Sequence, residues 1–373
     1  MKDKVLIYPY DSNFTPILRS DSLFERFGEI YLCSLNGSGL CGKDASFADG
    51  GELINIIVKK NFDELLSDVD TVIFTETDSY LDLERSLYPK IDKAINAQKR
   101  IINLAPLDVN ILNVFKNKCL ENGVAFENFS NNENLNIGEI DYRDGILSIN
   151  TPVVAIMGLS NSTGKFTTQL NMKKEFEENG YKVSVVGSRS YCSFLGYHSF
   201  PKFMTEKDFS DVEKIFVFNK FIKNIEKAEN PDVILICIPG GIVPYDHKIH
   251  NNFGITAFLV SQAVVPDAAV LCLFHEDFTA KYLELIENTV KYRFGFELDA
   301  FNISNRQIDW VEMVNAKPDQ VRSSTINMQF IDKTVQKSNG LTSISTYNLL
   351  KNKGELTDMI INKLSENSNS VVF

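Results

Sequence analysis

Long apolar runs are missing from this sequence, because no stretch of membrane-spanning length is free of charged residues. The opening Met1-Lys2-Asp3-Lys4 leads into an apolar run that is too short and too soon interrupted for a signal peptide. Cys-x-x-Cys pairs are also missing, although the chain has six cysteines. Three of these cysteines lie in or beside apolar, strand-like segments, as expected of reduced thiols that pack as small hydrophobic side chains. We therefore expect a cytoplasmic protein with no membrane partner.

Positive charge is scarce as well. The chain has 38 Lys and Arg residues against 49 Asp and Glu residues, which gives a net charge of −11. This balance argues against a broad surface that neutralises the phosphates of DNA or RNA, so we expect no nucleic-acid partner. The hydrophobic content of 44% is ordinary for a soluble globular protein, and 373 residues favour two domains with ample core for each.

Strands and helices alternate through residues 1–150. Strands are predicted at residues 5–10, 29–35, 71–75, 101–104 and 124–129. Helical spacing of apolar residues runs through Leu18, Leu23 and Phe27, and again at residues 62–66, 81–97 and 107–120. This alternation predicts a parallel sheet covered on both faces, that is, a Rossmann-like α/β domain. Residues 131–150 are polar and rich in turn signals, so they are expected to form a hinge to a second domain at residues 151–373.

One loop of this first half matches the Gly-x-Gly-x-x-Gly pattern of dinucleotide-binding proteins, at Gly37, Gly39 and Gly42. It follows the second strand and not the first, and no apolar helical run follows it. We therefore interpret it as a loop whose glycines adopt positive φ angles. It could still line a site at the strand ends, with Lys43 and Asp44 as its polar members.

The second half opens with a predicted buried strand at residues 153–158, a loop of small residues, and a helix that begins at Lys165. Such a turn directs backbone N–H groups and the helix N-terminus at one point, where a phosphate fits. Lys165 is expected at the mouth of the loop, where it would reach the outer phosphates of ATP, and Thr167 or Thr168 would bind Mg²⁺. The backbone donors are expected from Gly158, Ser160, Asn161, Ser162, Thr163 and Gly164. The loop departs from the usual P-loop, because five residues separate its glycines and Phe166 fills the usual Ser/Thr place.

The alternation of strands and helices continues beyond this loop. Strands are predicted at residues 182–186, 232–238 and 268–274, and helices at 169–178, 208–228, 254–265, 279–290 and 355–366. The strand at 232–238 enters Pro239-Gly240-Gly241, which should emerge at the same sheet edge as the phosphate loop. Glycines let a ligand approach the backbone, so we expect the acceptor substrate between the two domains, beside Gly240, Gly241 and His247.

All four histidines lie in this second half, at positions 198, 247, 250 and 275. His247 and His250 have no third and fourth ligand at recognisable spacing, which makes a zinc site a weak interpretation. Asp246 and His247 are candidate catalytic residues, because they combine an acceptor with a group that titrates near neutral pH. The alternative is a solvent-exposed loop whose polar residues serve only solubility.

Several segments resemble a dethiobiotin-synthetase-like P-loop family, including a branch associated with D-glutamate metabolism. The resemblance lies in the phosphate loop with its five-residue gap and Lys-x-Thr-Thr ending, in Gly187-Ser188-Arg189-Ser190, in residues 239–244, and in Pro266-Asp267-Ala268. Over its full length, including Tyr8-Pro9-Tyr10-Asp11 and residues 37–51, the chain also resembles a clostridial family of peptide maturation system proteins. The first resemblance implies a P-loop NTPase-like domain. The second implies a role beside ribosomally made peptide products, with other maturation proteins as partners.

Two departures from the dethiobiotin synthetases affect the chemistry. Ser160 stands near the place of an Asp, and Cys237 stands in place of a Glu, and both acids would help to hold magnesium. Asp246, Glu276 and Asp277 are candidates to replace them.

Two functions remain open from the sequence. The chain is either an ATP-dependent enzyme that activates a carboxylate or amine of a small molecule or peptide, or a non-catalytic partner gated by nucleotide. The residues do not decide between ATP and GTP, and they are compatible with a homodimer.

Overall fold

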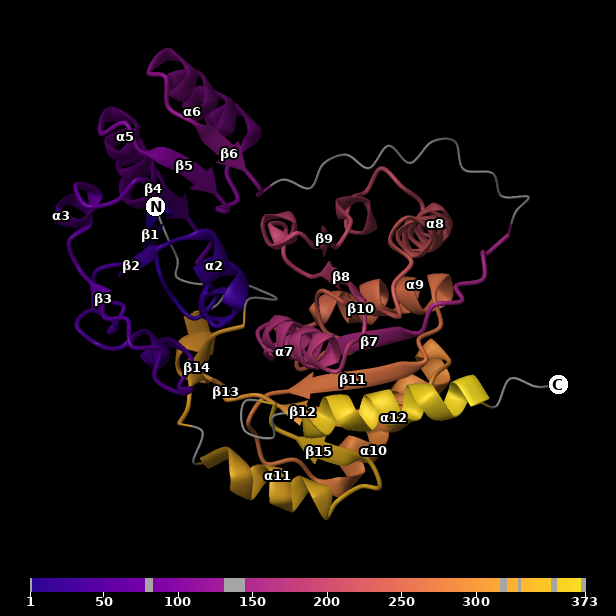
Figure 1. The fold of residues 1–373 in the computed structure, drawn as a ribbon. Helices are drawn as coiled ribbons and strands as arrows, with labels where there is room; N and C mark the ends of the chain where they lie inside the picture. Colours follow the sequence, from indigo (N-terminus) through magenta and orange to yellow (C-terminus); the bar gives the residue numbers. More distant parts are fainter. Residues whose placement is uncertain are drawn as a thin grey trace. The chain divides into compact units, whose positions relative to one another are not determined.

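The computed structural model describes residues 2–77, 83–130, 145–315, 321–327, 330–349 and 354–369. The chain is an α/β protein of two compact units (Figure 1). The first unit holds Met1–Glu133 with Ser193–Leu195, and the second holds Asn134–Cys192 and Gly196–Phe373. Residues 145–150, which we expected in the first domain, belong to the second unit. There the Leu147 N–H donates to Asn219 Oδ1 at 2.8 Å, and the Asn150 N–H donates to Glu226 Oε1 at 2.5 Å.

The first unit is built on a six-stranded parallel sheet in the order β3-β2-β1-β4-β5-β6, which is the Rossmann-like arrangement predicted. Its strands are β1 (Lys4–Tyr8), β2 (Glu29–Cys33), β3 (Val58–Lys59), β4 (Thr71–Phe74), β5 (Arg100–Asn103) and β6 (Phe126–Asn128). Its helices are α1 (Thr15–Leu18), α2 (Asp21–Arg26), α3 (Phe62–Leu66), α4 (Leu83–Ser86), α5 (Tyr88–Asn96) and α6 (Val109–Glu121). The short edge strand β3 was not predicted, since two residues carry no periodic signal.

The glycine loop of the first unit leads into a short 3-10 turn, η1 (Ala45–Ala48), and not into an α-helix. Gly37, Gly39 and Gly42 have φ angles of 87°, 74° and 81°, as the sequence predicted for this loop. Asp44 is buried, and its Oδ1 accepts hydrogen bonds from the backbone of Ser46 at 2.9 Å and of Ile54 at 3.0 Å. This carboxylate therefore holds its own loop together.

The second unit is built on a seven-stranded parallel sheet in the order β15-β12-β11-β7-β10-β8-β9. Its strands are β7 (Val153–Gly158), β8 (Val183–Gly187), β9 (His198–Ser199), β10 (Val233–Cys237), β11 (Ala268–Leu273), β12 (Ala300–Ile303) and β15 (Ser345–Tyr347). A separate antiparallel ribbon pairs β13 (Arg306–Ile308) with β14 (Ser323–Thr325).

The helices of the second unit cover both faces of its sheet (Figure 1). They are α7 (Lys165–Glu178), α8 (Asp211–Glu229), α9 (Ile255–Ala263), α10 (Ala280–Thr289), α11 (Ile331–Asn339) and α12 (Glu355–Asn369). The central strand β7 is buried at all six positions, because its alternate side chains enter two different cores. Val153, Ala155 and Met157 pack with α8, α9 and α10, whereas Val154 and Ile156 pack with α7 and α12.

Within the described ranges, no helix combines the length and the apolar character needed to cross a membrane. All six cysteines are free thiols.

Candidate functional site

The loop at residues 158–168, which we call the phosphate loop after the function that the sequence predicts for it, lies between two regular elements, as predicted. Strand β7 ends at Gly158 and helix α7 begins at Lys165. The loop turns back on itself through positive φ angles at Ser162 (61°) and Gly164 (79°). A Cβ atom at Gly158 would lie 2.4 Å from Thr163 Oγ1 and 2.9 Å from the Ser160 carbonyl oxygen, so only glycine fits where the strand ends. The loop is therefore closely packed where it joins the N-terminus of a long helix.

Lys165 does not lie at the mouth of the loop, where we expected it. Its side chain is only 7% exposed, and its Nζ donates to the carbonyl oxygen of Ser160 at 2.9 Å and to that of Gly240. Burial removes water from the ammonium group and lowers the pKa of Lys165 to about 8. The expectation failed because a long side chain at the first turn of a helix can fold back into the loop that precedes it.

The two threonines after Lys165 differ in availability. The Thr168 hydroxyl donates to the Gly164 carbonyl at 3.0 Å, accepts from Asn302 Nδ2 at 2.9 Å and lies 3.3 Å from Cys272 Sγ. It is buried, so it contributes to the core and not to an open site. Thr167 is half-buried and makes no side-chain hydrogen bond with any residue that the structure describes. Of the two candidates, Thr167 is the one with a hydroxyl to offer to Mg²⁺.

An asparagine that the sequence did not single out holds the loop in place. Asn251 Oδ1 accepts from Ser160 Oγ at 2.7 Å, and its Nδ2 donates to the carbonyls of Leu159 at 3.0 Å and Val243 at 2.7 Å. The Ser160 side chain is fully buried in this arrangement, which leaves only its backbone for a ligand. Since Asn251 lies 91 residues from Ser160, no local pattern could have indicated the contact.

Asn251 begins a turn of unusual backbone conformation. Asn251, Asn252 and Phe253 have φ angles of 50°, 47° and 53°, and Gly254 follows at 70°. Asparagine tolerates this left-handed region better than most residues, but an aromatic residue rarely adopts it. Gly254 is obligatory, because a Cβ there would lie 2.1 Å from the Ile242 carbonyl oxygen. Strain of this kind persists only where surrounding contacts enforce it, and here they bring Asn251 to the phosphate loop.

The Pro-Gly-Gly loop lies against the phosphate loop. Strands β7 and β10 are parallel neighbours, and the Ile242 N–H donates to the Gly158 carbonyl at 3.1 Å. A Cβ at Gly241 would lie 2.5 Å from the Leu159 carbonyl oxygen, which explains why a glycine stands there. The expectation that both loops emerge at one sheet edge is therefore met.

The two catalytic candidates on the following segment are less closely engaged. Asp246 Oδ1 accepts from the backbone N–H groups of Lys248 at 2.7 Å and Ile249 at 2.6 Å, so this oxygen closes the local turn. His247 is exposed. His250 stacks on Phe253, with ring centroids 5.5 Å apart. Across the described segments, no three His, Cys, Asp or Glu residues gather in a way that could hold a metal ion.

The structure also shows the surroundings of Cys237 and of Asp277 and Glu276, two of the acids expected to replace the missing carboxylates. Cys237 is fully buried at the end of β10, and burial raises the pKa of its thiol, an effect that Lys165 partly offsets. A neutral thiol cannot take the place of a carboxylate beside Mg²⁺. Asp277 is exposed and pairs with Lys337 at 2.7 Å. Glu276 is half-buried against Tyr245 and Trp310.

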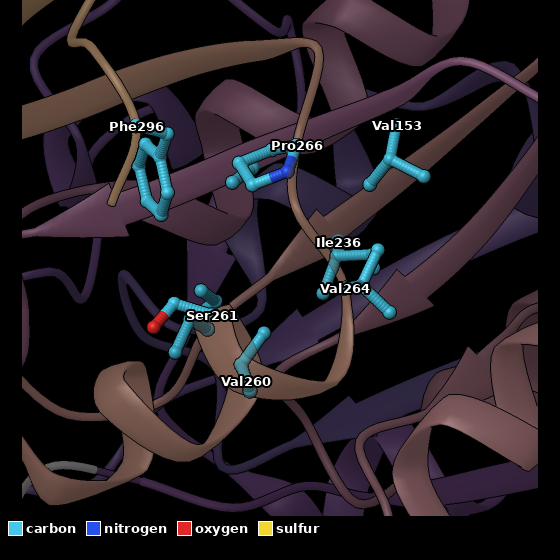
Figure 2. Close-up of a pocket in the computed structure, with 9 residues that line it drawn as sticks. Val153, Ile236, Val260, Ser261, Val264, Pro266 and Phe296 are labelled. Carbon is cyan, nitrogen blue, oxygen red and sulfur yellow. The ribbon is translucent and has the colours of Figure 1, made fainter. Parts of the chain in front are cut away.

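A small apolar cavity elsewhere in this unit is not part of the site. It lies under α9 and is lined by residues such as Val153, Ile236, Val264 and Phe296 (Figure 2). Its free space is about that of one water molecule. It is a packing gap in the core and has no residue of the phosphate loop in its wall.

No family model matches this sequence, and no curated protein matches it either. Among solved structures, a DUF1611 family protein from Anabaena variabilis ATCC 29413 matches 98% of this chain and 100% of its own, with 11% identity and a TM-score of 0.64. At that identity the likeness shows the fold alone. Homoserine dehydrogenase from S. aureus matches 62% of this chain and 52% of its own (14% identity, TM-score 0.27). Chloroplast FtsY from Physcomitrella patens matches 65% of this chain and 77% of its own (14% identity, TM-score 0.28). These last two likenesses are too distant to support an argument.

Proposed function

We propose that the second unit binds ATP with Mg²⁺ at the loop 158–168, and that the protein is an ATP-dependent enzyme of the ligase, synthetase or kinase type. It would activate a carboxylate or amine of a small molecule or peptide. One observation carries the proposal: a buried ammonium group, Lys165 Nζ, lies inside a tight glycine-bounded loop at the N-terminus of a fourteen-residue helix. Such a loop combines a positive charge, a helix dipole and backbone N–H groups, which is the set that phosphates require.

The present contacts of Lys165 suggest how nucleotide would bind. The ammonium group now donates hydrogen bonds to two uncharged backbone carbonyls, which are weaker partners than a phosphate. An incoming phosphate chain would take this ammonium group, while the N–H groups of residues 160–164 cradle its oxygens and Thr167 contributes to the magnesium ion. Catalysis of phosphoryl transfer then consists mainly of positioning and charge neutralisation.

The biological setting follows from the resemblances and stays a proposal. We infer a cytoplasmic protein of natural-product peptide maturation, which works beside other maturation proteins. Six free thiols and the absence of a spanning helix from the described residues agree with that compartment.

A second candidate is a non-catalytic partner that changes its affinity for a maturation enzyme or precursor peptide when nucleotide binds. The settings of Ser160 and Cys237 favour it, because a hydrogen-bonded hydroxyl and a buried thiol stand where carboxylates would help to hold magnesium. Nucleotide binding would then persist without efficient phosphoryl transfer.

The binding proposal is tested by calorimetric titration of ATP and Mg²⁺ into the wild type, Lys165→Ala and Lys174→Ala. Lys174 is an exposed lysine on the same helix and serves as the matched control. We expect Lys165→Ala to lose affinity by about a hundredfold or more, since a charge-assisted hydrogen bond to phosphate is removed. Equal affinities in the three proteins would refute the phosphate-loop assignment. Product analysis with ATP and candidate acids or amines then separates an enzyme from a gated partner.

A further inference from the structure

A carboxyl group that lacks a cationic partner lies just beyond the carboxyl end of β11. Glu276 is half-buried, and its Oε1 atom is buried without a hydrogen-bond partner among the described residues. Burial raises the pKa of this carboxyl group, and no basic residue in the described part of the chain counters the effect. A buried carboxyl oxygen left unsatisfied calls for an explanation, such as a ligand that it binds.

The remaining surroundings of Glu276 are aromatic. The side chains of Tyr245 and Trp310 lie close enough to its carboxyl group to lower its pKa and so partly offset the effect of burial. Their rings lie 6.1 Å apart at an angle of 31°, and Tyr245 packs edge-on against Phe274 at 6.1 Å. Trp310 is 49% exposed, so it is the side of this group that faces solvent. We call Tyr245, Glu276 and Trp310 the aromatic–carboxylate cluster.

Two further carboxylates act on the cluster as like charges. Asp246 acts on Tyr245, and Asp277 acts on Glu276. The negative charge of Asp277 is partly balanced by Lys337, but Glu276 has no ion pair with any described residue. A cation would therefore be attracted to the cluster, and an anion would be repelled.

We propose that the aromatic–carboxylate cluster binds an organic ammonium group, such as the side chain of a lysine in a peptide or the amine of a small molecule. The carboxylate would neutralise the charge, one ammonium N–H would satisfy Glu276 Oε1, and the ring faces would attract the cation. A shift of the half-exposed Trp310 ring would give the ligand access to the carboxyl group. A divalent metal fits less well, since only one carboxylate is present and aromatic rings supply no oxygen ligands.

This inference goes beyond the proposed nucleotide site and does not depend on it. Trp310 is the single tryptophan of the chain, so its fluorescence reports on the cluster alone. The experiment is a fluorescence titration of the full-length protein without nucleotide, at constant ionic strength. The probes are N-acetyl-lysine methylamide and tetramethylammonium, and the neutral control is N-acetyl-norleucine methylamide.

We expect a saturable change in Trp310 emission with at least one ammonium probe and none with the norleucine compound. Glu276→Gln should weaken that affinity by about tenfold or more, because the charge is lost while the shape is kept. Asp277→Asn is the matched control, and it should stay within about twofold of wild type, since an exposed ion pair contributes little.

Three outcomes would overturn the inference: no saturable change with either ammonium probe, an unchanged affinity in Glu276→Gln, or equal binding of the norleucine compound. Thermal unfolding checks that each variant is folded. If Glu276→Gln does not fold, Tyr245→Leu replaces it, because it removes one ring face of the cluster. An affinity for tetramethylammonium that survives this change would also contradict the inference. None of these results bears on ATP binding, which is measured separately.

Discussion

Two glycine-rich loops of this protein each follow a parallel strand, yet their glycines have different purposes. At Gly37, Gly39 and Gly42 of the first unit, an added Cβ would meet no atom within 4 Å, so these glycines supply only a backbone conformation. At Gly158 of the second unit, an added Cβ would collide with Thr163 at 2.4 Å. A glycine pattern is therefore informative about a ligand site only when the chain around it closes onto the loop.

The elements that follow the two loops also differ, in length and in how deeply the neighbouring lysine is buried. The first loop leads to a 3-10 turn of four residues, with the exposed Lys43 over the ring of Phe47. The second leads to a fourteen-residue helix, with Lys165 buried inside the loop. A helix N-terminus and a desolvated cation are what convert a turn into an anion site. Substitutions in the two loops probe this difference in addition to Lys165→Ala.

The pH dependence of unfolding should distinguish the two lysines. The folded-state pKa of Lys165 is lowered to about 8, so the unfolded chain binds more protons between pH 8 and about 10.4. The free energy of unfolding should therefore gain roughly 3 kcal/mol from this group as the pH rises through that window. Urea titrations of the wild type and Lys165→Met measure the gain as a difference. Lys43→Met, at an exposed position, is the control for removing a lysine. If Lys165→Met kept the pH profile of the wild type, Lys165 would not be buried.

Alanine substitutions should separate the two kinds of glycine. Gly158→Ala forces Thr163 or the loop backbone to move and should cost about 2.5 kcal/mol of unfolding free energy. Gly39→Ala meets only the penalty of its positive φ angle and should cost about 1 kcal/mol. Chemical denaturation measures both values. Similar losses in the two variants would show that close packing does not distinguish the loops.

Removal of the asparagine that supports the second loop should cost about 2 kcal/mol. Asn251→Ala leaves Ser160 Oγ and the carbonyls of Leu159 and Val243 without their present partner. Asn252→Gly is the control, because it shares the left-handed turn but is exposed and should change stability little. Thermal unfolding and the ATP affinity should both fall in Asn251→Ala. If only Asn252→Gly lowered the stability, the loss would come from the backbone of the turn and not from the hydrogen bonds of Asn251.

The smallest effect is expected for dinucleotides. NAD and NADP should leave the melting temperature unchanged, since no helix N-terminus follows the loop 37–42. A saturating ligand would raise it by an amount set by its concentration relative to Kd. A clear, concentration-dependent rise with either cofactor would restore the dinucleotide interpretation.

Local pattern was sufficient for the longer strands and helices that flank the loop at residues 158–168, but not for short strands such as β3 and β9. Residues 153–158 form an apolar run, and Gly164-Lys165 precedes a segment of helical spacing, so strand, loop and helix were predicted within one or two residues. The α/β class followed from the alternation of such segments. The spacing of apolar residues that distinguishes a strand from a helix can be read from consecutive residues.

No local sequence pattern indicated the burial or the contacts of the site residues. The burial of Lys165, the support of Ser160 by Asn251 and the meeting of Glu276 with Tyr245 and Trp310 join residues that are far apart in the chain or depend on how one side chain folds back. Each depends on which loops the sheet order brings to one edge, and burial and hydrogen bonding are properties of that packing. The amino-acid sequence thus specified which chemical groups are available, whereas the fold determined which of them are enclosed, paired or left open, because desolvation and contact exist only once distant segments have come together.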